Sequence, residues 1–208
     1  MSSVRVKICG LTRSEDVAAA VAAGCDALGF VFVHGSPRYL DEATAGALVQ
    51  VVPAFVSRVG LFLDQGAEQV RQVLQRVPLS ILQFHGTEEA EFCRQFGRPY
   101  IKAISLASGV KVVDAEKAYP DAAAILVDSH APGGQGGTGK TVNWQELSAG
   151  SLPLILAGGL NPANVATAVN MVKPWAVDVS SGVESAPGIK DAVAMRRFIE
   201  EARRGQRS

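Results

Sequence analysis

Short apolar runs rich in β-branched residues recur about every 25 residues along the chain, and a helical pattern follows each run. This alternation is typical of βα units around a parallel sheet that is buried on both faces. The strands that we expect are Val4–Cys9, Ala27–Val33, Phe55–Leu61, Ser80–Phe84, Tyr100–Ile104, Ala124–Asp128, Leu154–Ala157 and Ala176–Val179. The expected helices are Ser14–Ala23, Asp41–Val51, Gly66–Arg76, Glu88–Phe96, Val110–Ala118, a short Asn143–Ala149, Pro162–Met171 and Ile189–Arg203.

The number of βα units limits the choice of fold. Eight units within 208 residues match a compact (β/α)8 barrel, the TIM barrel, whose smallest domains contain roughly 200 residues. A doubly wound open sheet more often stops at about five or six strands. Because no linker, low-complexity tract or composition shift interrupts the chain, we expect residues 1–208 to form one barrel domain. Two helix starts are marked, by Asn161 before Pro162 and by Thr87 before Glu88.

Charge and apolar content argue against several classes of protein. The chain has 20 basic and 20 acidic residues, so it has no net field to hold nucleic acid or an anionic membrane. Its first residues lack the continuous apolar segment of a signal peptide, and no run reaches transmembrane length. The cysteines Cys9, Cys25 and Cys93 lack CxxC or zinc-ligand spacing, so we expect reduced thiols. These features predict a cytoplasmic protein without nucleic-acid or membrane partners.

The most glycine-rich loop of the chain follows the strand that ends at Asp128. Its residues Gly134–Thr141 match GxxxxGK[ST], the phosphate-binding P-loop of nucleotide-binding proteins. A P-loop follows its strand directly and begins a substantial helix, whereas Ser-His-Ala-Pro intervenes here and only a short segment follows Thr141. A loop that closes over a substrate explains the glycines better. A P-loop module stays as an alternative.

In a (β/α)8 barrel the chemistry takes place at the carboxyl ends of the strands. Cys9 ends the first expected strand and Asp128 ends the sixth, so the two would face each other across the barrel mouth. A free cysteine is usually an inert core residue, and a carboxylate in this position can simply accept loop N–H groups. Facing one small substrate, however, a thiol and a carboxyl group are a plausible base and acid.

Other polar residues at the same rim are candidates for substrate binding. Arg38, stiffened by Pro37, is suited to bidentate recognition of a carboxylate, although most loop arginines are only solvated. Glycines and serines follow the seventh and eighth strands, where barrels often bind phosphate through backbone N–H groups, although such glycines can also be tight turns. These residues are Gly158, Gly159, Ser180, Ser181 and Gly182. They predict a phosphorylated small-molecule substrate.

Three histidines and Lys7 also occur in or near the expected strands. His34, His85 and His130 each occur singly, which is more typical of hydrogen-bonded structural residues than of metal ligands, so we assign no metal. Lys7 could reach either the barrel mouth or the helix layer, and the sequence leaves this open.

Several sequence blocks resemble the phosphoribosylanthranilate isomerases of tryptophan biosynthesis. The blocks are VKICGLTR (Val6–Arg13), GFVF with SPRY (Gly29–Tyr39), LQFHG (Leu82–Gly86), ILVDS with GGTGKT (Ile125–Thr141), LAGGLNPANV (Leu156–Val165) and VDVSSGVESAPGIKD (Val177–Asp191). Together and in this order they are highly specific. The resemblance implies a (β/α)8 barrel that performs an Amadori rearrangement of N-(5-phosphoribosyl)anthranilate without a cofactor.

The resemblance also implies individual roles. Cys9 would be the general base and Asp128 the general acid, and the thiol of Cys9 would need a pKa tuned towards neutral pH. Arg38 would bind the anthranilate carboxylate, and Asp178 would lie near the sugar hydroxyls. The phosphate would lie at the backbone of the glycines and serines named above, and residues 136–140 would fold over the substrate. We count two residues of LQFHG, Gln83 and His85, among the substrate-binding residues.

The chain departs from the resembling family at Val142-Asn143-Trp144, where an aromatic residue and Asp often precede Trp. Asn caps a helix about as well as Asp, so the departure concerns loop closure and not the chemistry. A barrel that isomerises another phosphorylated aminosugar, as in the histidine pathway, stays as an alternative, although that substrate has phosphates at both ends. So does a barrel that only binds a sugar phosphate. The sequence leaves monomer and homodimer open.

Overall fold

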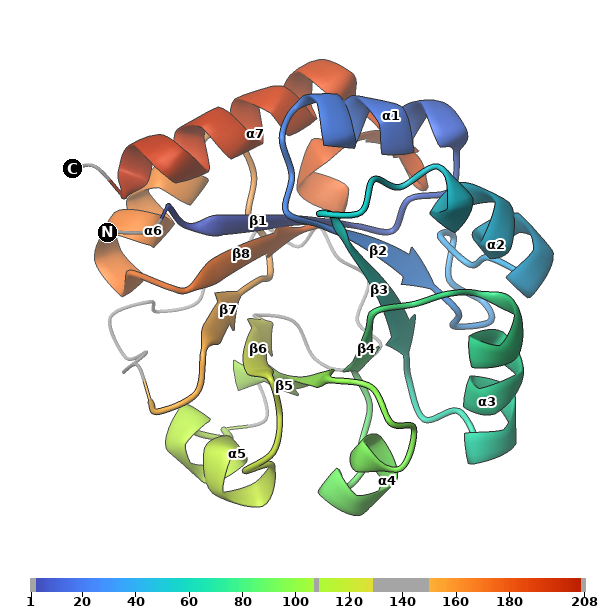
Figure 1. Ribbon diagram of the computed structural model, residues 1–208. Helices are drawn as coiled ribbons and strands as arrows, with labels where there is room; N and C mark the ends of the chain where they lie inside the picture. Colours follow the sequence, from blue (N-terminus) through green and yellow to red (C-terminus); the bar gives the residue numbers. More distant parts are fainter. Residues whose placement is uncertain (1–2, 107–108, 129–149, 207–208) are drawn as a thin grey trace.

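The computed structural model describes residues 3–106, 109–128 and 150–206. Its eight parallel strands close into a barrel in chain order, and β8 pairs with β1 (Figure 1). The strands are β1 (Arg5–Cys9), β2 (Ala27–Val31), β3 (Ser57–Phe62), β4 (Ile81–Phe84), β5 (Tyr100–Ser105), β6 (Ala124–Asp128), β7 (Leu154–Leu156) and β8 (Ala176–Val179). The predicted (β/α)8 barrel is therefore confirmed, with each strand within two residues of its expected bounds.

Helices surround the barrel on the outside (Figure 1). They are α1 (Ser14–Ala22), α2 (Glu42–Gln50), α3 (Ala67–Arg76), α4 (Ala90–Arg94), α5 (Val112–Ala118), α6 (Val165–Val172) and α7 (Ala192–Gly205). The helix expected at Asn143–Ala149 lies outside the described residues. None of the helices in the described ranges has the length and apolar character to cross a membrane.

Both helix starts that a cap residue marks in the sequence are wrong. Helix α6 begins at Val165, because the Asn161 side chain accepts the Ala163 N–H at 2.8 Å and so caps a preceding turn. Helix α4 begins at Ala90, because the backbone N–H and the hydroxyl of Thr87 both donate to Asp64 of the preceding loop, at 2.6 and 2.9 Å. Asn161 thus bonds within the turn just before the helix, and Thr87 bonds to a distant loop, so neither residue caps the helix expected to follow it.

The expected last helix also begins later than predicted. Ile189–Lys190 forms strand β10, which pairs with β9 (Glu184–Ala186) in a small antiparallel hairpin after β8. Helix α7 then starts after Asp191, whose carboxylate accepts the N–H groups of Val193 and Ala194 at 2.8 and 2.9 Å. The hairpin places Glu184 and Lys190 beside the end of β8.

The alternation of side chains along the strands divides the core into two layers. Small and medium apolar residues fill the barrel interior: Val59, Ile101, Ala103, Ala124, Leu126, Ile155, Ala157 and Ala176. Larger ones fill the space between the barrel and the helices, among them the fully buried Phe30, Phe62, Phe84 and Phe198. Because inward positions repeat every second residue, the last inward residues of the strands lie together at the carboxyl-end rim.

A buried ion pair fixes the loop that follows β4. The Lys102 ammonium lies 2.9 Å from the Glu88 carboxylate, and both side chains are almost fully buried. Lys102 also donates to the Gly86 carbonyl at 2.6 Å, and Glu88 accepts the Asp64 N–H at 2.8 Å. Breaking such a pair leaves an uncompensated buried charge, so this loop is firmly held. It begins at His85.

Candidate active site

Cys9 is the last residue of β1 and is only 4% exposed. It pairs in register with Gly29 of β2, and a Cβ atom at position 29 would lie 2.6 Å from the Cys9 sulfur. Gly29 therefore leaves the space that the thiol fills. This explains why a small residue stands in the middle of an otherwise bulky strand.

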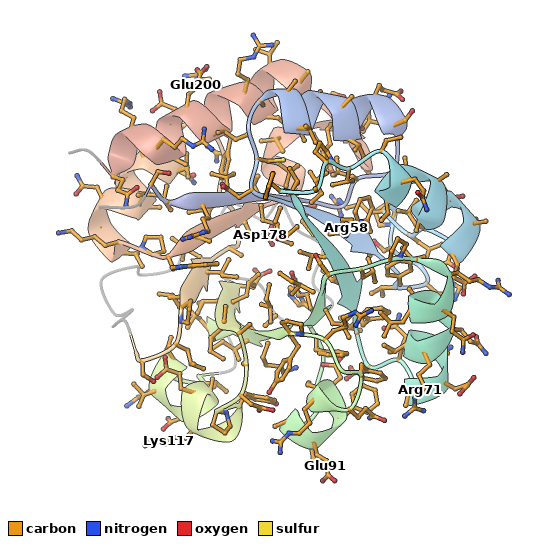
Figure 2. All side chains as sticks on the ribbon, viewed as in Figure 1. Arg58, Arg71, Glu91, Lys117, Asp178 and Glu200 are labelled. Carbon is orange, nitrogen blue, oxygen red and sulfur yellow. The ribbon has the colours of Figure 1, made fainter. Side chains whose placement is uncertain are left out.

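Lys7 lies on the same face of β1 as Cys9 and points into the barrel. Its ammonium is 2.9 Å from the carboxylate of Asp178, and both residues are buried. Figure 2 labels Asp178 among the strands of the barrel. Burial works to lower the pKa of Lys7, but the charges and hydrogen bonds of Asp178 and Cys9 outweigh it and raise this pKa. Lys7 is therefore a charged ammonium between a carboxylate and the thiol, and the question that the sequence left open is answered.

The pKa of the Cys9 thiol is raised, contrary to the expectation that the site tunes it towards neutral pH. Burial is the largest cause, and Asp178 adds to it, whereas Lys7 and Lys190 act in the opposite direction. A thiolate is poorly solvated at this depth in the barrel, and two ammonium groups do not compensate fully. The surrounding residues therefore favour the thiol form.

Asp128 ends β6 and lies beside His85, which follows β4. The Asp128 carboxylate is 3.5 Å from His85 Nε2, and His85 Nδ1 is 3.1 Å from the Gln83 amide nitrogen. Gln83 is fully buried, and its Oε1 atom has no hydrogen-bond partner within the described part of the chain. An amide nitrogen that donates to Nδ1 leaves the proton on Nε2, where it faces the carboxylate. The three residues thus form a chain of polar contacts that orients Asp128.

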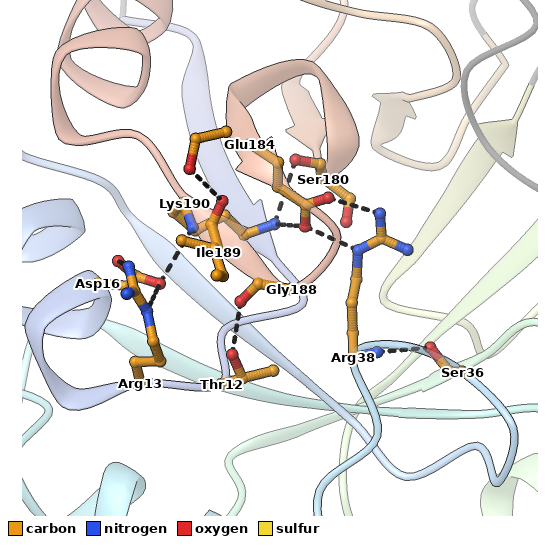
Figure 3. Close-up of polar contacts among 11 residues, drawn as sticks. Thr12, Arg13, Asp16, Ser36, Arg38, Ser180, Glu184, Gly188, Ile189 and Lys190 are labelled. Atoms are coloured by element: carbon orange, nitrogen blue, oxygen red, sulfur yellow. Dashed lines mark hydrogen bonds and ion pairs between the residues drawn. The ribbon is translucent and has the colours of Figure 1, made fainter.

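Arg38 reaches the rim from the loop after β2 and lies against Glu184 (Figure 3). Its Nε atom is 2.8 Å from Glu184 Oε1, and its Nη2 atom is 2.7 Å from Oε2. Gly10 has a φ of +78°, and a Cβ atom there would lie 2.4 Å from Arg38 Cδ. The chain therefore needs glycine at this position both for its backbone and for the passage of the arginine stem.

Lys190 completes this cluster from strand β10. Its ammonium is 2.7 Å from Glu184 Oε1 and 3.1 Å from the Ser180 carbonyl (Figure 3). Burial works to raise the pKa of Glu184, but hydrogen bonds from Arg38 and Lys190 outweigh it and lower this pKa, so Glu184 is a carboxylate. Burial lowers the pKa of Lys190, and the Glu184 carboxylate opposes this shift. Sequence reasoning assigned no role to Glu184, Lys190 or Lys7.

The loops after β7 and β8 touch each other. Gly158 and Gly159 have φ values of +81° and +65°, which favour glycine. A Cβ atom at Gly182 would lie 1.9 Å from the Leu160 carbonyl oxygen, so only glycine allows this contact. Gly182 lies in the short 3₁₀ turn η3 (Ser181–Val183), which Ser180 precedes. The structure thus brings all five residues of the expected phosphate site into one region of the rim.

Residues outside this rim have ordinary structural roles. Burial raises the pKa of Cys25 and of Cys93 to about 12, so both are inert thiols. His34 packs against the Tyr39 ring, with centroids 4.3 Å apart. Within the described ranges, no cluster of three or more His, Cys, Asp or Glu side chains could hold a metal ion. His130, Lys140, the P-loop match Gly134–Thr141 and the expected closing segment 136–140 lie outside these ranges.

Comparisons with known proteins agree on one family. The family model described as N-(5'-phosphoribosyl)anthranilate (PRA) isomerase matches residues 6–201. The N-(5'-phosphoribosyl)anthranilate isomerase of Hahella chejuensis is 49% identical over 202 residues, which are 97% of this chain and 95% of that protein. The enzyme of the same name from Pseudomonas aeruginosa is 49% identical over 208 residues, which are 100% of this chain and 99% of that protein.

Solved structures agree with the sequence comparisons. The phosphoribosyl anthranilate isomerase of Thermotoga maritima superposes with a TM-score of 0.84 at 40% identity, covering 96% of this chain and 98% of that one. A phosphoribosyl anthranilate isomerase in complex with reduced 1-(o-carboxyphenylamino)-1-deoxyribulose 5-phosphate has a TM-score of 0.80 at 38% identity, with the same coverage. A third structure, at TM-score 0.79 and 37% identity, again covers 96% and 98% and describes monomers generated from the dimeric enzyme of Thermotoga maritima.

Proposed function

Because the chain belongs to the N-(5'-phosphoribosyl)anthranilate isomerase family of tryptophan biosynthesis, we propose that Cys9 is the base and Asp128 the acid of its isomerisation reaction. The reaction is an Amadori rearrangement that yields 1-(2-carboxyphenylamino)-1-deoxyribulose 5-phosphate. The observation that carries the proposal is the position of the two residues, which end β1 and β6 at the same rim of the barrel. Catalytic groups in this fold come from the ends of different strands.

The proposed steps transfer one proton at each residue. Asp128 protonates the furanose ring oxygen, and the C1–O bond breaks as the nitrogen lone pair forms an iminium ion. Cys9, as thiolate, removes the C2 proton, and the electron pair of that C–H bond forms the C1–C2 double bond of an enolamine while the iminium is neutralised. Tautomerisation moves the proton of the hydroxyl group on C2 to the carbon C1 and gives the ketone at C2.

Lys7 is the residue that most favours the thiolate in this scheme, with a smaller contribution from Lys190. Its ammonium lies beside Cys9 and lowers the pKa of the thiol, although burial raises that pKa by more. Asp178, which is 2.9 Å from Lys7, holds the ammonium in place and lies near the proposed position of the sugar hydroxyls. His85 and Gln83 orient Asp128 and border the bound sugar.

Arg38 is the proposed contact for the anthranilate carboxylate. Arg38→Met should raise KM by about 10- to 100-fold with little change in kcat, because it removes charge-assisted hydrogen bonds that are equally strong in the ground and transition states. Steady-state kinetics measure this split. Arg71→Met, on the outer surface of α3 (Figure 2), is a matched control that should change neither constant. A fall in kcat alone for Arg38→Met would contradict a role in substrate anchoring.

The proposed phosphate contacts are the backbone groups of Gly158, Gly159, Ser180, Ser181 and Gly182. Gly182→Ala should raise KM by at least about tenfold, because its Cβ atom would displace the backbone from Leu160 and misplace N–H donors. Gly46→Ala is the control, since its Cβ atom would make only an ordinary 3.6 Å contact and alanine favours helix α2. Thermal unfolding shows whether Gly182→Ala is folded. A folded Gly182→Ala enzyme with unchanged KM would remove this segment from the phosphate site.

The direct test of the reaction is the loss of anthranilate-type fluorescence when purified protein meets N-(5'-phosphoribosyl)anthranilate without metal or cofactor. We expect rapid turnover. If a folded protein gave none, the substrates to try next would be the doubly phosphorylated aminosugar of the histidine pathway and Mg-ATP. Turnover of the histidine-pathway substrate alone would support the alternative isomerase, and Lys140-dependent binding of Mg-ATP would support the P-loop alternative.

The proposal includes a single barrel domain over residues 1–208 that works in the cytoplasm as a monomer or a homodimer on a phosphorylated small molecule. Its partners include neither nucleic acid nor membrane. The two oligomeric states have different masses in solution, and sedimentation equilibrium at micromolar concentration distinguishes them. Phe55, fully exposed on the connection between α2 and β3, is a position at which a polar substitution tests whether any dimer uses that end of the barrel.

A further inference from the structure

Glu184 occupies one of the two hydrogen-bonding edges of the Arg38 guanidinium. Its carboxylate accepts from Nε and Nη2, at 2.8 and 2.7 Å, in a bidentate contact (Figure 3). Nη1 has no hydrogen-bond partner among the residues that the structure describes. A guanidinium presents five N–H donors in a rigid plane, so the edge formed by Nη1 and Nη2 can still bind a second carboxylate.

Lys190 changes the charge of this cluster. A pair made of Arg38 and Glu184 alone would be neutral and would attract a substrate anion only weakly. The Lys190 side chain is fully buried, and its ammonium is 2.7 Å from Glu184, so two cations share one carboxylate. The cluster therefore keeps one net positive charge. The Lys190 backbone is itself fixed, because its N–H donates to Asp16 at 3.1 Å.

We propose that Glu184 and Lys190 are positioning residues that hold Arg38 so that its Nη1–Nη2 edge faces the substrate carboxylate. Glu184 fixes the plane of the guanidinium, and Lys190 keeps its positive charge available to the substrate. An unrestrained arginine side chain loses rotamer freedom when it binds a ligand, and an arginine that is already ordered loses less of it. The inference rests on the proposed role of Arg38 as the carboxylate anchor.

A role in carboxylate recognition differs from a general structural role in one measurable way. If Glu184 only held the hairpin of β9 and β10 in place, its loss would disturb every ligand of the rim. If it acts through Arg38, its loss disturbs only ligands that carry the carboxylate. Glu184→Asp is the suitable variant, because it keeps the charge while the shorter side chain cannot reach both nitrogens.

The test measures dissociation constants by calorimetry for two stable ligands. One is reduced 1-(o-carboxyphenylamino)-1-deoxyribulose 5-phosphate, and the other is the same molecule without its carboxylate. Glu184→Asp should raise the dissociation constant of the first ligand about tenfold, as expected for the loss of one charge-assisted hydrogen bond. It should leave the dissociation constant of the second ligand unchanged. Lys190→Met should also raise the dissociation constant of the first ligand. Glu201→Asp on α7, where Glu201 pairs with Arg204, is the matched control and should change neither.

Arg38→Met provides the second half of the cycle. With Arg38 removed, Glu184→Asp should have no further effect on the carboxylate ligand. Equal weakening of both ligands by Glu184→Asp, or an effect that adds fully to that of Arg38→Met, would overturn the positioning role while leaving Arg38 as the anchor. If Arg38→Met itself weakened both ligands equally or neither, the proposed role of Arg38 would fall, and this inference with it.

Discussion

Replacing Cys9 by alanine is expected to lower kcat by at least about 100-fold, the lower end of what a general base contributes. The thiol lies at the end of β1 next to Lys7 and is 4% exposed, so no water can readily take its place as a base. The variant should fold, because losing one buried sulfur atom leaves only a small cavity beside Gly29. Stopped-flow fluorescence at saturating substrate measures kcat directly.

The control for Cys9 is Cys93→Ala, which removes another buried thiol outside the barrel mouth and should leave kcat unchanged. In an Asp128→Asn background, where no carboxylic acid has to stay protonated, the residual kcat/KM should rise with pH through the neutral range and into the alkaline range, because burial raises the pKa of Cys9 and more thiolate forms at higher pH. Cys9→Ala in the same background should lose this dependence. Turnover of Cys9→Ala at the parent rate would remove the residue from the mechanism.

Replacing Asp128 by asparagine is expected to lower kcat by about 100-fold or more, because an amide cannot protonate the ring oxygen. Asparagine has nearly the same shape and keeps an oxygen atom facing His85, whose Nε2 atom lies 3.5 Å from the carboxylate. Substrate affinity and the thermal unfolding temperature should therefore change little. Kinetic measurements that separate kcat from KM, together with a thermal melt, check both points.

The control for Asp128 is Asp114→Asn on the exposed side of α5, where the carboxylate pairs weakly with Lys117 at 3.8 Å. It should behave as the parent in both measurements. If Asp128→Asn raised KM and kept kcat, Asp128 would be a binding residue, and the proton donor would have to be sought among its neighbours.

The fold was predictable because each strand is an apolar run, and strands that follow one another in the chain also lie side by side in the barrel. One error occurs where a side chain finds a distant partner. Glu88 was expected to begin a helix, but it pairs with Lys102 of the next strand, fourteen residues later, and the helix starts after it. No local pattern shows that a lysine within an apolar strand will be buried with a carboxylate.

The site was predictable in part for a similar reason. Cys9 and Asp128 could be assigned to the rim because strand ends meet there, and a family resemblance gave them roles. The partners of Arg38 could not be found in this way, since Glu184 lies 146 residues away along the chain. The raised pKa of Cys9 was also not predictable, because it depends on burial within the closed barrel.

The seam between β1 and β8 joins the two ends of the chain, and its polar contacts have very large sequence separations. Lys7 reaches Asp178 across 171 residues, and the Asp16 carboxylate accepts the Lys190 N–H across 174. Contacts of this kind form late in folding, because a long loop must close before they stabilise the chain. A molecule with only its first six strands assembled would contain Cys9, Arg38 and Asp128. It would lack the partners around them, Asp178, Glu184 and Lys190, which follow in the chain. During refolding, enzymatic activity should therefore return only with closure of the ring, later than most of the helical signal.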